Sequence, residues 1–375
     1  MSGDTSPMNA QMSRLQTGLA WLSGLVSLLV LAMALLSGTA PLVLLLFAAA
    51  GALTLLRFVL PLPFWIDGPV SLLGAVALLL TLPVYASEPG FFWLALLACW
   101  SLAWLFVERL SQAIRSHAVS GRWFGLLIPL IFGLALLFIW EIVTRGANVP
   151  QVLLPAPSQI WARLVTSVPT LVADFQQTFL KAVLAGYAMG CAAGFLTAIL
   201  VDRSPFLKAG LLPIGNFVSA LPIIGIAPIM VMWFGFDWQS KAAVVVAMTF
   251  FPMLVNTVAG LNQSAAIERD LMRTYAASYS QTLFKLRLPA AAPFIFNALK
   301  INSTLALIGA IVAEFFGTPI VGMGFRISTE VGRLNIDLVW AEIAMAAVAG
   351  SAFYGVIALV ERSVTFWHPS VRGRA

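Results

Sequence analysis

The stretch NQSAAIERDLMRTYAASYSQTLFKLRLP, residues 262–289, is a polar island between two long apolar runs at 241–261 and 292–316. Apolar residues recur within it at four-residue spacing, which predicts one apolar stripe along a helix. The stripe consists of Ile267, Leu271, Tyr275, Tyr279 and Leu283, and the charged residues off the stripe are Glu268, Arg269, Asp270 and Arg273. The pattern fits a helix lying in a lipid interface, and it fits equally a helix docked on a partner protein.

Small residues mark the middle of this segment, and a proline marks its end. The small residues Ala276, Ala277 and Ser278 stand at its middle, where they allow close backbone approach or a break between two short helices. Leu288-Pro289 ends the segment, because proline lacks an N–H donor and restricts the residue before it.

The composition of the whole chain points to a membrane. Of its 375 residues, 61% are hydrophobic and 10% are charged, whereas a soluble domain carries about 25% charged residues. The chain lacks the polar surface to face water on all sides, so we predict an integral membrane protein. The net charge of +6 is typical of basic cytoplasmic loops beside anionic lipid, and we prefer this interpretation to nucleic-acid binding.

Membrane-spanning helices account for most of the chain. A spanning helix needs about 20 mostly apolar residues. This criterion predicts about ten of them, near 15–36, 40–61, 66–86, 91–107, 123–143, 179–201, 212–234, 241–261, 292–316 and 339–361. Most of the 21 Lys and Arg residues fall in inside segments if the N-terminus is cytoplasmic, which predicts that both termini are cytoplasmic. We therefore expect an all-α polytopic membrane protein with 262–289 in the cytoplasm.

Cysteine and histidine do not form a metal-binding pattern. Cys99 and Cys191 lie in apolar runs and are typical of small buried hydrophobes rather than of a disulfide framework. His117 and His368 are far apart, in predicted loops, so no His/Cys metal centre is expected. The chain has no Gly-x-x-x-x-Gly-Lys-Ser/Thr phosphate loop, so we expect it neither to bind nor to hydrolyse ATP.

The chain divides into parts of different character. Residues 1–107 hold four closely spaced spans, 108–122 form a basic linker, and 123–375 hold six spans with longer, more polar connections. Function more often lies on such longer connections. We interpret the Leu- and Ala-rich first part as a lateral scaffold that serves assembly or the fit to the lipid bilayer. The alternative is a role in substrate gating.

The polar island resembles the EAA loop of permeases from binding-protein-dependent ABC importers. The family pattern is Glu-Ala-Ala, three residues, Gly, and then a Leu-Pro ending thirteen residues after the Gly. Anchoring it on Leu288-Pro289 puts the Glu position at Asp270, the Ala positions at Leu271 and Met272, and the Gly position at Ala276. The acidic character of the Glu position is kept by Asp270 and the small size of the Gly position by Ala276, while the Ala-Ala pair and the Gly itself are not present.

Further stretches extend the resemblance over most of 123–369, with the type-1 transmembrane domain at about 175–361. They are Leu154–Ser158, Ala220–Pro228 followed by Trp233-Phe234-Gly235, Phe250-Phe251-Pro252 with Asn256-Thr257 and Gly260-Leu261, Gly309–Phe315, and Trp367-His368-Pro369-Ser370. Together they look most like the nitrate/sulfonate/taurine branch, which includes carriers of pyrimidine-type vitamin precursors. Residues 1–120 lie outside the resemblance.

The resemblance implies a transport subunit rather than an enzyme. It implies a permease homodimer in the cell inner membrane, with ATP and Mg²⁺ on separate cytoplasmic ATPase subunits, and a periplasmic or surface solute-binding protein as the further partner. The ATPase-coupling residues would be Asp270, Leu271, Met272, Arg273, Ala276, Ala277, Ser278 and Pro289. Asp270 could pair with a cation on the ATPase or cap its own helix. The solute, whether nitrate, a sulfonate, taurine or a pyrimidine, is not distinguished.

Polar groups and prolines inside the spans are candidates for the translocation path, since a charge at bilayer depth costs about 2.5–3.5 kcal/mol. The candidates are Pro222, Pro228, Asn256, Asn297, Lys300, Thr304 and Glu314. Lys300 would offer positive potential to an anion, or else snorkel to the headgroups or pair with a carboxylate across the dimer. Glu314 would more often be structural, at the outer gate. Pro222, Pro228 and Pro252 are expected to interrupt spans that line the pore or kink for packing.

Two other function classes compete with the importer. A secondary transporter or channel driven by an ion gradient would carry acidic residues at mid-span, and only Glu314 comes close. An intramembrane enzyme would need a nucleophile–base pair or a metal site within the bilayer, and both histidines are in predicted loops.

Overall fold

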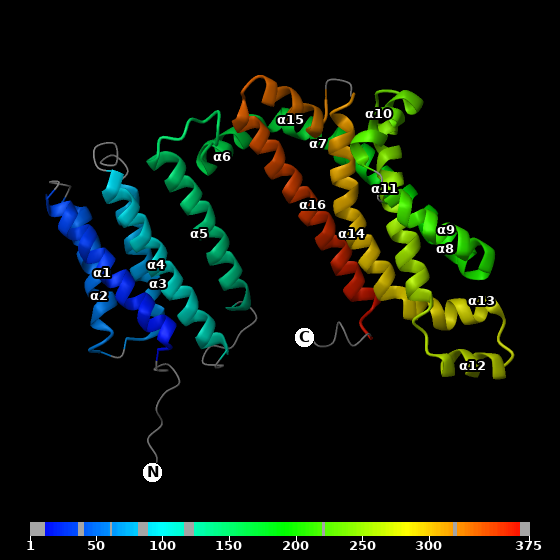
Figure 1. The fold of residues 1–375 in the computed structure, drawn as a ribbon, viewed down its shortest axis with the longest axis horizontal. Coiled ribbons are helices and arrows are strands. Elements are labelled where there is room, and N and C mark those ends of the chain that lie inside the picture. The colour runs from blue at the N-terminus through cyan, green and yellow to red at the C-terminus, as the bar shows by residue number, and fades with distance from the viewer. Residues whose placement is uncertain are drawn as a thin grey trace, which may run out of the picture. The chain divides into compact units, whose positions relative to one another are not determined.

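The computed structural model describes residues 12–36, 41–60, 62–81, 89–115, 124–219, 222–317 and 321–367, and every regular element in those ranges is helical (Figure 1). The all-α prediction is confirmed. Seven described helices are long and apolar enough to cross a membrane, and three shorter apolar helices, Leu45–Leu56, Asp67–Leu80 and Ile223–Phe234, coincide with further predicted spans. The chain forms two compact units, Met1–Gln159 and Ile160–Ala375.

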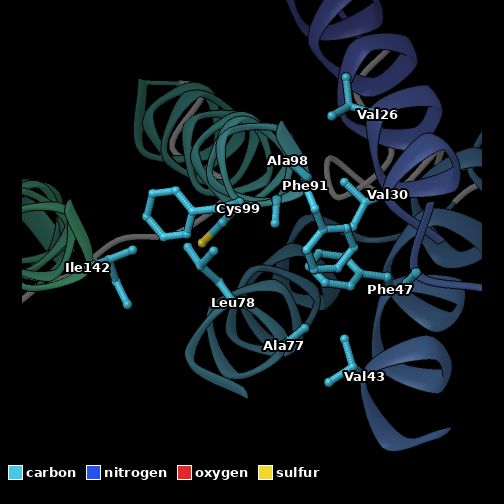
Figure 2. Packing of buried hydrophobic residues seen from close by; sticks show 13 residues of the cluster. Val26, Val30, Val43, Phe47, Ala77, Leu78, Phe91, Ala98, Cys99 and Ile142 are labelled. Atoms are coloured by element: carbon cyan, nitrogen blue, oxygen red, sulfur yellow. The ribbon is translucent and has the colours of Figure 1, made fainter. Parts of the chain in front are cut away.

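In the described residues, the first unit contains five α-helices. They are α1 (Arg14–Leu36), α2 (Pro41–Leu56), α3 (Asp67–Thr81), α4 (Pro89–Arg115) and α5 (Phe124–Gly146), with a 3₁₀ turn, η2, at Phe64–Ile66. Their core interdigitates aromatic and small residues, with Val30, Phe47, Leu78, Phe91 and Cys99 among its members (Figure 2). Cys99 is a buried core residue, as expected. Within this unit α5 contributes Ile142 to the same cluster.

A buried ion triad closes one end of this unit. Asp67 accepts from Arg57, and its other oxygen accepts from Arg109 Nη1 at 2.8 Å. Arg57 Nε also donates to the Thr54 carbonyl at 2.8 Å, and Arg109 Nη2 donates to the Leu62 carbonyl at 3.0 Å. Because these charges are paired and hydrogen-bonded, the helix ends can bury them.

The second unit contains the remaining elements. They are α6 (Pro157–Thr166), α7 (Val168–Phe175), the π-helical segment η4 (Gln176–Val183), α8 (Leu184–Arg203), α9 (Pro205–Ser219), α10 (Ile223–Phe234), α11 (Trp238–Leu261), α12 (Ala266–Thr274), α13 (Tyr279–Thr282), the π-helical turn η5 (Leu283–Arg287), α14 (Leu288–Glu314), α15 (Met323–Gly332) and α16 (Ile336–Val364).

Glycines let α8 pack closely on α11. A Cβ at Gly190 would lie 2.1 Å from Thr249 Oγ1, and one at Gly194 would lie 2.4 Å from the Phe250 carbonyl oxygen. Gly186 repeats the same spacing one turn earlier and also faces α11. Small residues four positions apart are a recurrent means of close helix packing in membranes. The pair α8–α11, with α14 on α11, forms the centre of this unit.

The predicted element boundaries need three corrections. The span expected at 212–234 is two helices, because α9 ends at Ser219 and Pro222 is the extended N-cap of α10. Pro228 and Pro252 lie inside α10 and α11 and do not interrupt them, since membrane helices tolerate proline where neighbours satisfy the backbone. The linker expected at 108–122 begins as helix, because α4 continues to Arg115; the rest of it lies outside the described residues.

Candidate functional site

Helix α12 presents the first part of the predicted apolar stripe to its surroundings; the single helix through Leu283 is not formed, because α12 ends at Thr274. None of its residues is buried within the described chain. Ile267 and Tyr275 are each 79% exposed and Leu271 is 57% exposed, while Leu283 at the far end of the stripe is buried. Water-exposed apolar side chains aligned on one helix face are typical of a binding surface.

A sharp break separates α12 from α13. Ala276 has φ 51°, a left-handed conformation that L-residues other than Gly rarely adopt. The amides of Ala276 and Ala277 donate to the carbonyls of Arg273 and Met272 at 2.9 and 3.0 Å, which closes the last turn of α12. Ser278 then caps α13 by accepting from the Gln281 amide at 3.3 Å. The position that aligns with the Gly of the EAA pattern is thus the one that needs positive φ.

Asp270 does not cap its helix, contrary to one of the two expected roles. Glu268 does so, because its Oε2 accepts from the Ala265 amide at 2.9 Å. Asp270 instead pairs with Arg273 at 3.2 Å on the exposed side of α12. Such an exposed pair contributes only about 0–1 kcal/mol to stability, so both side chains remain free to exchange partners.

A buried ion pair fastens the break to the spans. Arg287 donates from Nη1 and Nη2 to both oxygens of Asp202, at 2.6 and 2.7 Å, and from Nε to the Leu261 carbonyl at 3.0 Å. The Tyr279 hydroxyl donates to Asp202 at 3.0 Å, and the Arg203 guanidinium lies 5.5 Å from the centre of the Tyr279 ring. These contacts join α13 to the ends of α8 and α11, immediately before Pro289 in the first turn of α14. Sequence reasoning missed both Asp202 and the role of Arg287.

The candidate path residues are not gathered into one site. Lys300 Nζ donates to Glu361 of α16 at 2.8 Å, so its carboxylate partner lies in the same chain. Asn297 and Thr304 are exposed on the Lys300 side of α14. Asn256 donates to the Pro252 carbonyl at 2.8 Å. Glu314 lies at the other end of α14 and is buried.

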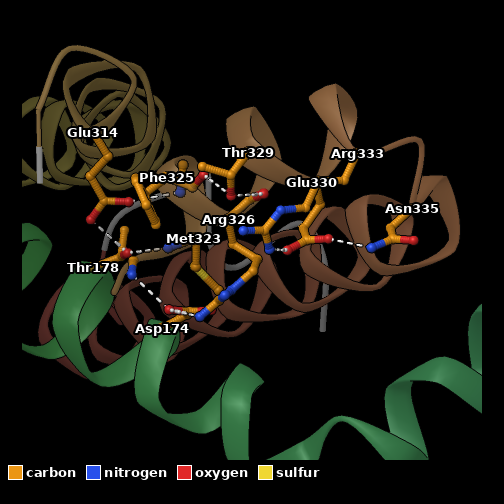
Figure 3. A network of polar contacts seen from close by, with 12 residues as sticks. Asp174, Thr178, Glu314, Met323, Phe325, Arg326, Thr329, Glu330, Arg333 and Asn335 are labelled. Carbon is orange, nitrogen blue, oxygen red and sulfur yellow. Dashed lines mark hydrogen bonds and ion pairs between the residues drawn. The ribbon is translucent and has the colours of Figure 1, made fainter. Parts of the chain in front are cut away.

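A polar network surrounds Glu314 at that end (Figure 3). Its carboxylate accepts from Thr178 Oγ1 at 2.8 Å and from the Gly324 amide at 2.7 Å, and Thr178 Oγ1 accepts from the Met323 amide at 2.8 Å. A Cβ at Gly322 would lie 2.7 Å from Glu314 Oε1, which explains the glycine there.

Asp174 holds the same turn from α7. It accepts from the Gly322 amide at 2.6 Å and from Arg326 Nε at 2.8 Å. The hydrogen bond from Arg326 to Asp174 raises the pKa of Arg326 above its ordinary value. The first turn of α15 is therefore fixed by two carboxylates, Asp174 and Glu314, and sequence reasoning identified only the second.

Comparison with known proteins identifies the family. Residues 186–367 match the family described as binding-protein-dependent transport system inner membrane component. The chain is similar to a probable ABC transporter permease protein of Haemophilus influenzae, at 34% identity over 58% of this chain and 88% of the relative. It is 31% identical to the formylaminopyrimidine transport permease protein ThiX of Halalkalibacterium halodurans, over 66% of this chain and 98% of the relative. It is also 28% identical to a putative aliphatic sulfonates transport permease protein, SsuC, of Bacillus subtilis, over 66% and 89%.

The matched region contains most of α8 together with α11, the α12–α13 break and α14, and so includes the polar island 262–289. All three relatives carry permease names. The chain therefore belongs to the family of ABC importer permeases, the inner membrane components of binding-protein-dependent transport systems.

Proposed function

We propose that this permease subunit couples to a cytoplasmic ATPase through the helix pair α12–α13. The observation that carries the proposal is the exposed stripe of Ile267, Leu271 and Tyr275 on a helix with no buried residue. A stripe lying in lipid would give the same sequence pattern, but the ion pair from Arg287 to Asp202 favours a surface that transmits force. The docking set would be Asp270, Leu271, Met272, Arg273, Ala276, Ala277, Ser278 and Pro289.

Motion of the helix pair would reach the spans through a short chain of contacts. Arg287 binds Asp202 on α8 and the Leu261 carbonyl at the end of α11, and it directly precedes α14. These three helices pack on one another. A displacement of α12 by the ATPase would therefore move α8, α11 and α14 together rather than bend a flexible loop.

The wider assembly is proposed by analogy with the family. We propose about ten crossing helices, in which a six-helix core within 123–375 is supplemented by four helices of 1–107. Two permease copies would lie in the inner membrane with both termini cytoplasmic. ATP and Mg²⁺ would bind the partner ATPases, and a solute-binding protein would deliver solute to the outer face. The first four helices would be a lateral scaffold.

The solute would be a small polar compound. Relatives are named for aliphatic sulfonates, taurine and formylaminopyrimidine, so we propose a sulfonate, taurine, nitrate or pyrimidine-type compound for this chain. Asn297, Lys300 and Thr304 share one side of α14, which supports a path along that helix. The pair between Lys300 and Glu361 would have to open for Lys300 to meet an anion.

Carboxylates placed on the stripe test the docking. The Ile267→Glu and Leu271→Glu variants should lose co-purification with the ATPase by roughly tenfold or more, because an unpaired charge would enter an apolar contact. Both side chains are exposed in the free chain, so expression and thermal stability should not change. The control is Gln263→Glu, which adds the same charge at an exposed position off the stripe. Equal ATPase recovery with all three variants would contradict the coupling role of α12.

A further inference from the structure

A cavity with mixed polar and apolar walls lies at the end of the second unit opposite the helix pair. It has a volume of about 640 Å³, and its wall includes Gln176, Gln177, Lys181, Phe236 and Asp237. Asp237 precedes the first residue of α11, whereas α12 follows the last residue of α11, so the cavity and the docking surface are separated by the whole of that helix. A volume of this size is ample for a small solute.

The π-helical segment η4 sets the polar side of this cavity. Gln177 and Lys181 lie four residues apart in η4, and Lys181 Nζ donates to Gln177 Oε1 at 3.0 Å. The neighbouring residue Thr178 is turned away to Glu314, at 2.8 Å. π-Helical turns are rare and are frequent at functional sites. Here the turn divides its polar side chains between the cavity and the buried network.

Gln177 connects two opposite charges without neutralising them. Its amide nitrogen donates to Asp237 Oδ1 at 2.8 Å, while its amide oxygen accepts from Lys181. The two hydrogen bonds to Asp237, from the Trp238 amide and from Gln177, both end on Oδ1. Within the part of the chain that the structure describes, Oδ2 of Asp237 and two of the three Lys181 protons therefore have no hydrogen-bond partner.

The groups around Asp237 keep its carboxylate charged and in place. The hydrogen bond from the Trp238 amide, followed by that from Gln177, holds the pKa of Asp237 below its ordinary value of 3.8, so the carboxylate is ionised at neutral pH. Lys241 is buried and donates to the Phe236 carbonyl at 2.5 Å, which fixes the backbone that carries Asp237. Among the described residues of its wall, the cavity thus offers the Lys181 ammonium and the Asp237 carboxylate, bridged by the neutral amide of Gln177.

We propose that this cavity is a solute subsite for a small zwitterion, whose acidic group binds Lys181 and whose ammonium binds Asp237 Oδ2. A solute with only a negative charge could bind Lys181, but the Asp237 carboxylate would repel it. The cavity therefore disfavours simple anions as solutes. The assignment rests on the proposed transport function, and it narrows the solute class by the charges of the cavity wall rather than by the names of relatives.

Two probes of nearly equal size test the proposal. 2-Aminoethanesulfonate carries an ammonium group where 2-hydroxyethanesulfonate carries a hydroxyl. Binding of each to the full-length permease in nanodiscs, without ATPase or binding protein, is measured by saturation-transfer NMR titration. We expect the amino compound to bind about threefold to fivefold more tightly, as suits one extra partly exposed ion pair.

Variants then assign the two charges. Asp237→Asn keeps the Oδ1 acceptor for Trp238 and Gln177, and should abolish the preference for the amino compound. Lys181→Gln should weaken both probes, and Lys208→Gln, an exposed lysine on α9 away from the cavity, should weaken neither. Equal binding of the two probes would identify a plain anion site and overturn the proposal. The proposal would also be overturned if neither probe bound, or if neither cavity variant changed the binding. Because no ATPase is present, failure here leaves the docking of α12 untouched, and the reverse holds for the Ile267→Glu test.

Discussion

Replacing Asp202 by Asn should release the helix pair α12–α13 from the spans while leaving its shape intact. Asn has nearly the same size and still offers an oxygen to the Tyr279 hydroxyl. It loses the charge that both guanidinium nitrogens of Arg287 meet at 2.6 and 2.7 Å. The Asp202 and Arg287 side chains are only 5% and 14% exposed, so little solvent screens the loss.

The expected magnitude follows from this burial. Breaking a buried ion pair by removing one partner costs about 3–5 kcal/mol, and the hydrogen bonds that Asn can still make return about 1 kcal/mol. A net loss of about 2–4 kcal/mol would raise the open fraction of the segment roughly 30- to 1000-fold. Helices this short have little stability of their own once detached.

Hydrogen–deuterium exchange measures the opening directly, because the amides of Ala276 and Ala277 are hydrogen-bonded at the break. The matched control is Asp270→Asn, the same chemical change in an exposed pair with Arg273, which should alter exchange by less than about fivefold. If the peptides covering 266–282 exchanged equally fast in both variants, the ion pair to Arg287 would not be what anchors this segment.

Three further outcomes are expected. Gly190→Ala should lower the free energy of unfolding by about 1–3 kcal/mol, because its Cβ would come within 3.0 Å of the α11 backbone. Gly355→Ala is the control, since its Cβ would have nothing within 4 Å. Equal melting temperatures of the two variants would argue against tight α8–α11 packing. Ala276→Gly should slow exchange at the break by relieving about 1 kcal/mol of left-handed strain, and faster exchange would contradict that origin. Lys300→Met should destabilise the chain by orphaning Glu361, and the Lys300→Met/Glu361→Gln double variant should restore its melting temperature; if the double variant also transports normally, Lys300 has no place in the path.

The sequence alone predicted what depends on local pattern. Apolar runs predicted the helical membrane fold, and four-residue spacing predicted the stripe on α12. The small residues at 276–278 allowed a break, and the structure has it at Ala276. These features are local because each is decided by neighbours within one or two turns of the chain.

Contacts between distant positions could not be predicted in this way. Arg287 and Asp202 are separated by 85 positions, and Arg326 and Asp174 by 152. A single sequence gives no sign that two such charges meet. The spacing of Gly186, Gly190 and Gly194 was the one available signal for the α8–α11 contact, since small residues four apart indicate close packing. Pro228 was over-interpreted, because a proline inside a membrane helix need not end it.

The distance along the chain between Asp202 and Arg287 also bears on how the protein is made. At about 5–20 residues per second of synthesis, the 85 residues from Arg203 to Arg287 take roughly 4–17 s to synthesise. During that interval α9, α10 and α11 are synthesised, while the Asp202 carboxylate has no guanidinium partner. The pair can form only after Arg287 has been synthesised, so a chain stopped before that residue would retain an unpaired acid at the end of α8. The ion pair therefore forms, at the earliest, after α8 and α11 have been synthesised and just as the synthesis of α14 begins.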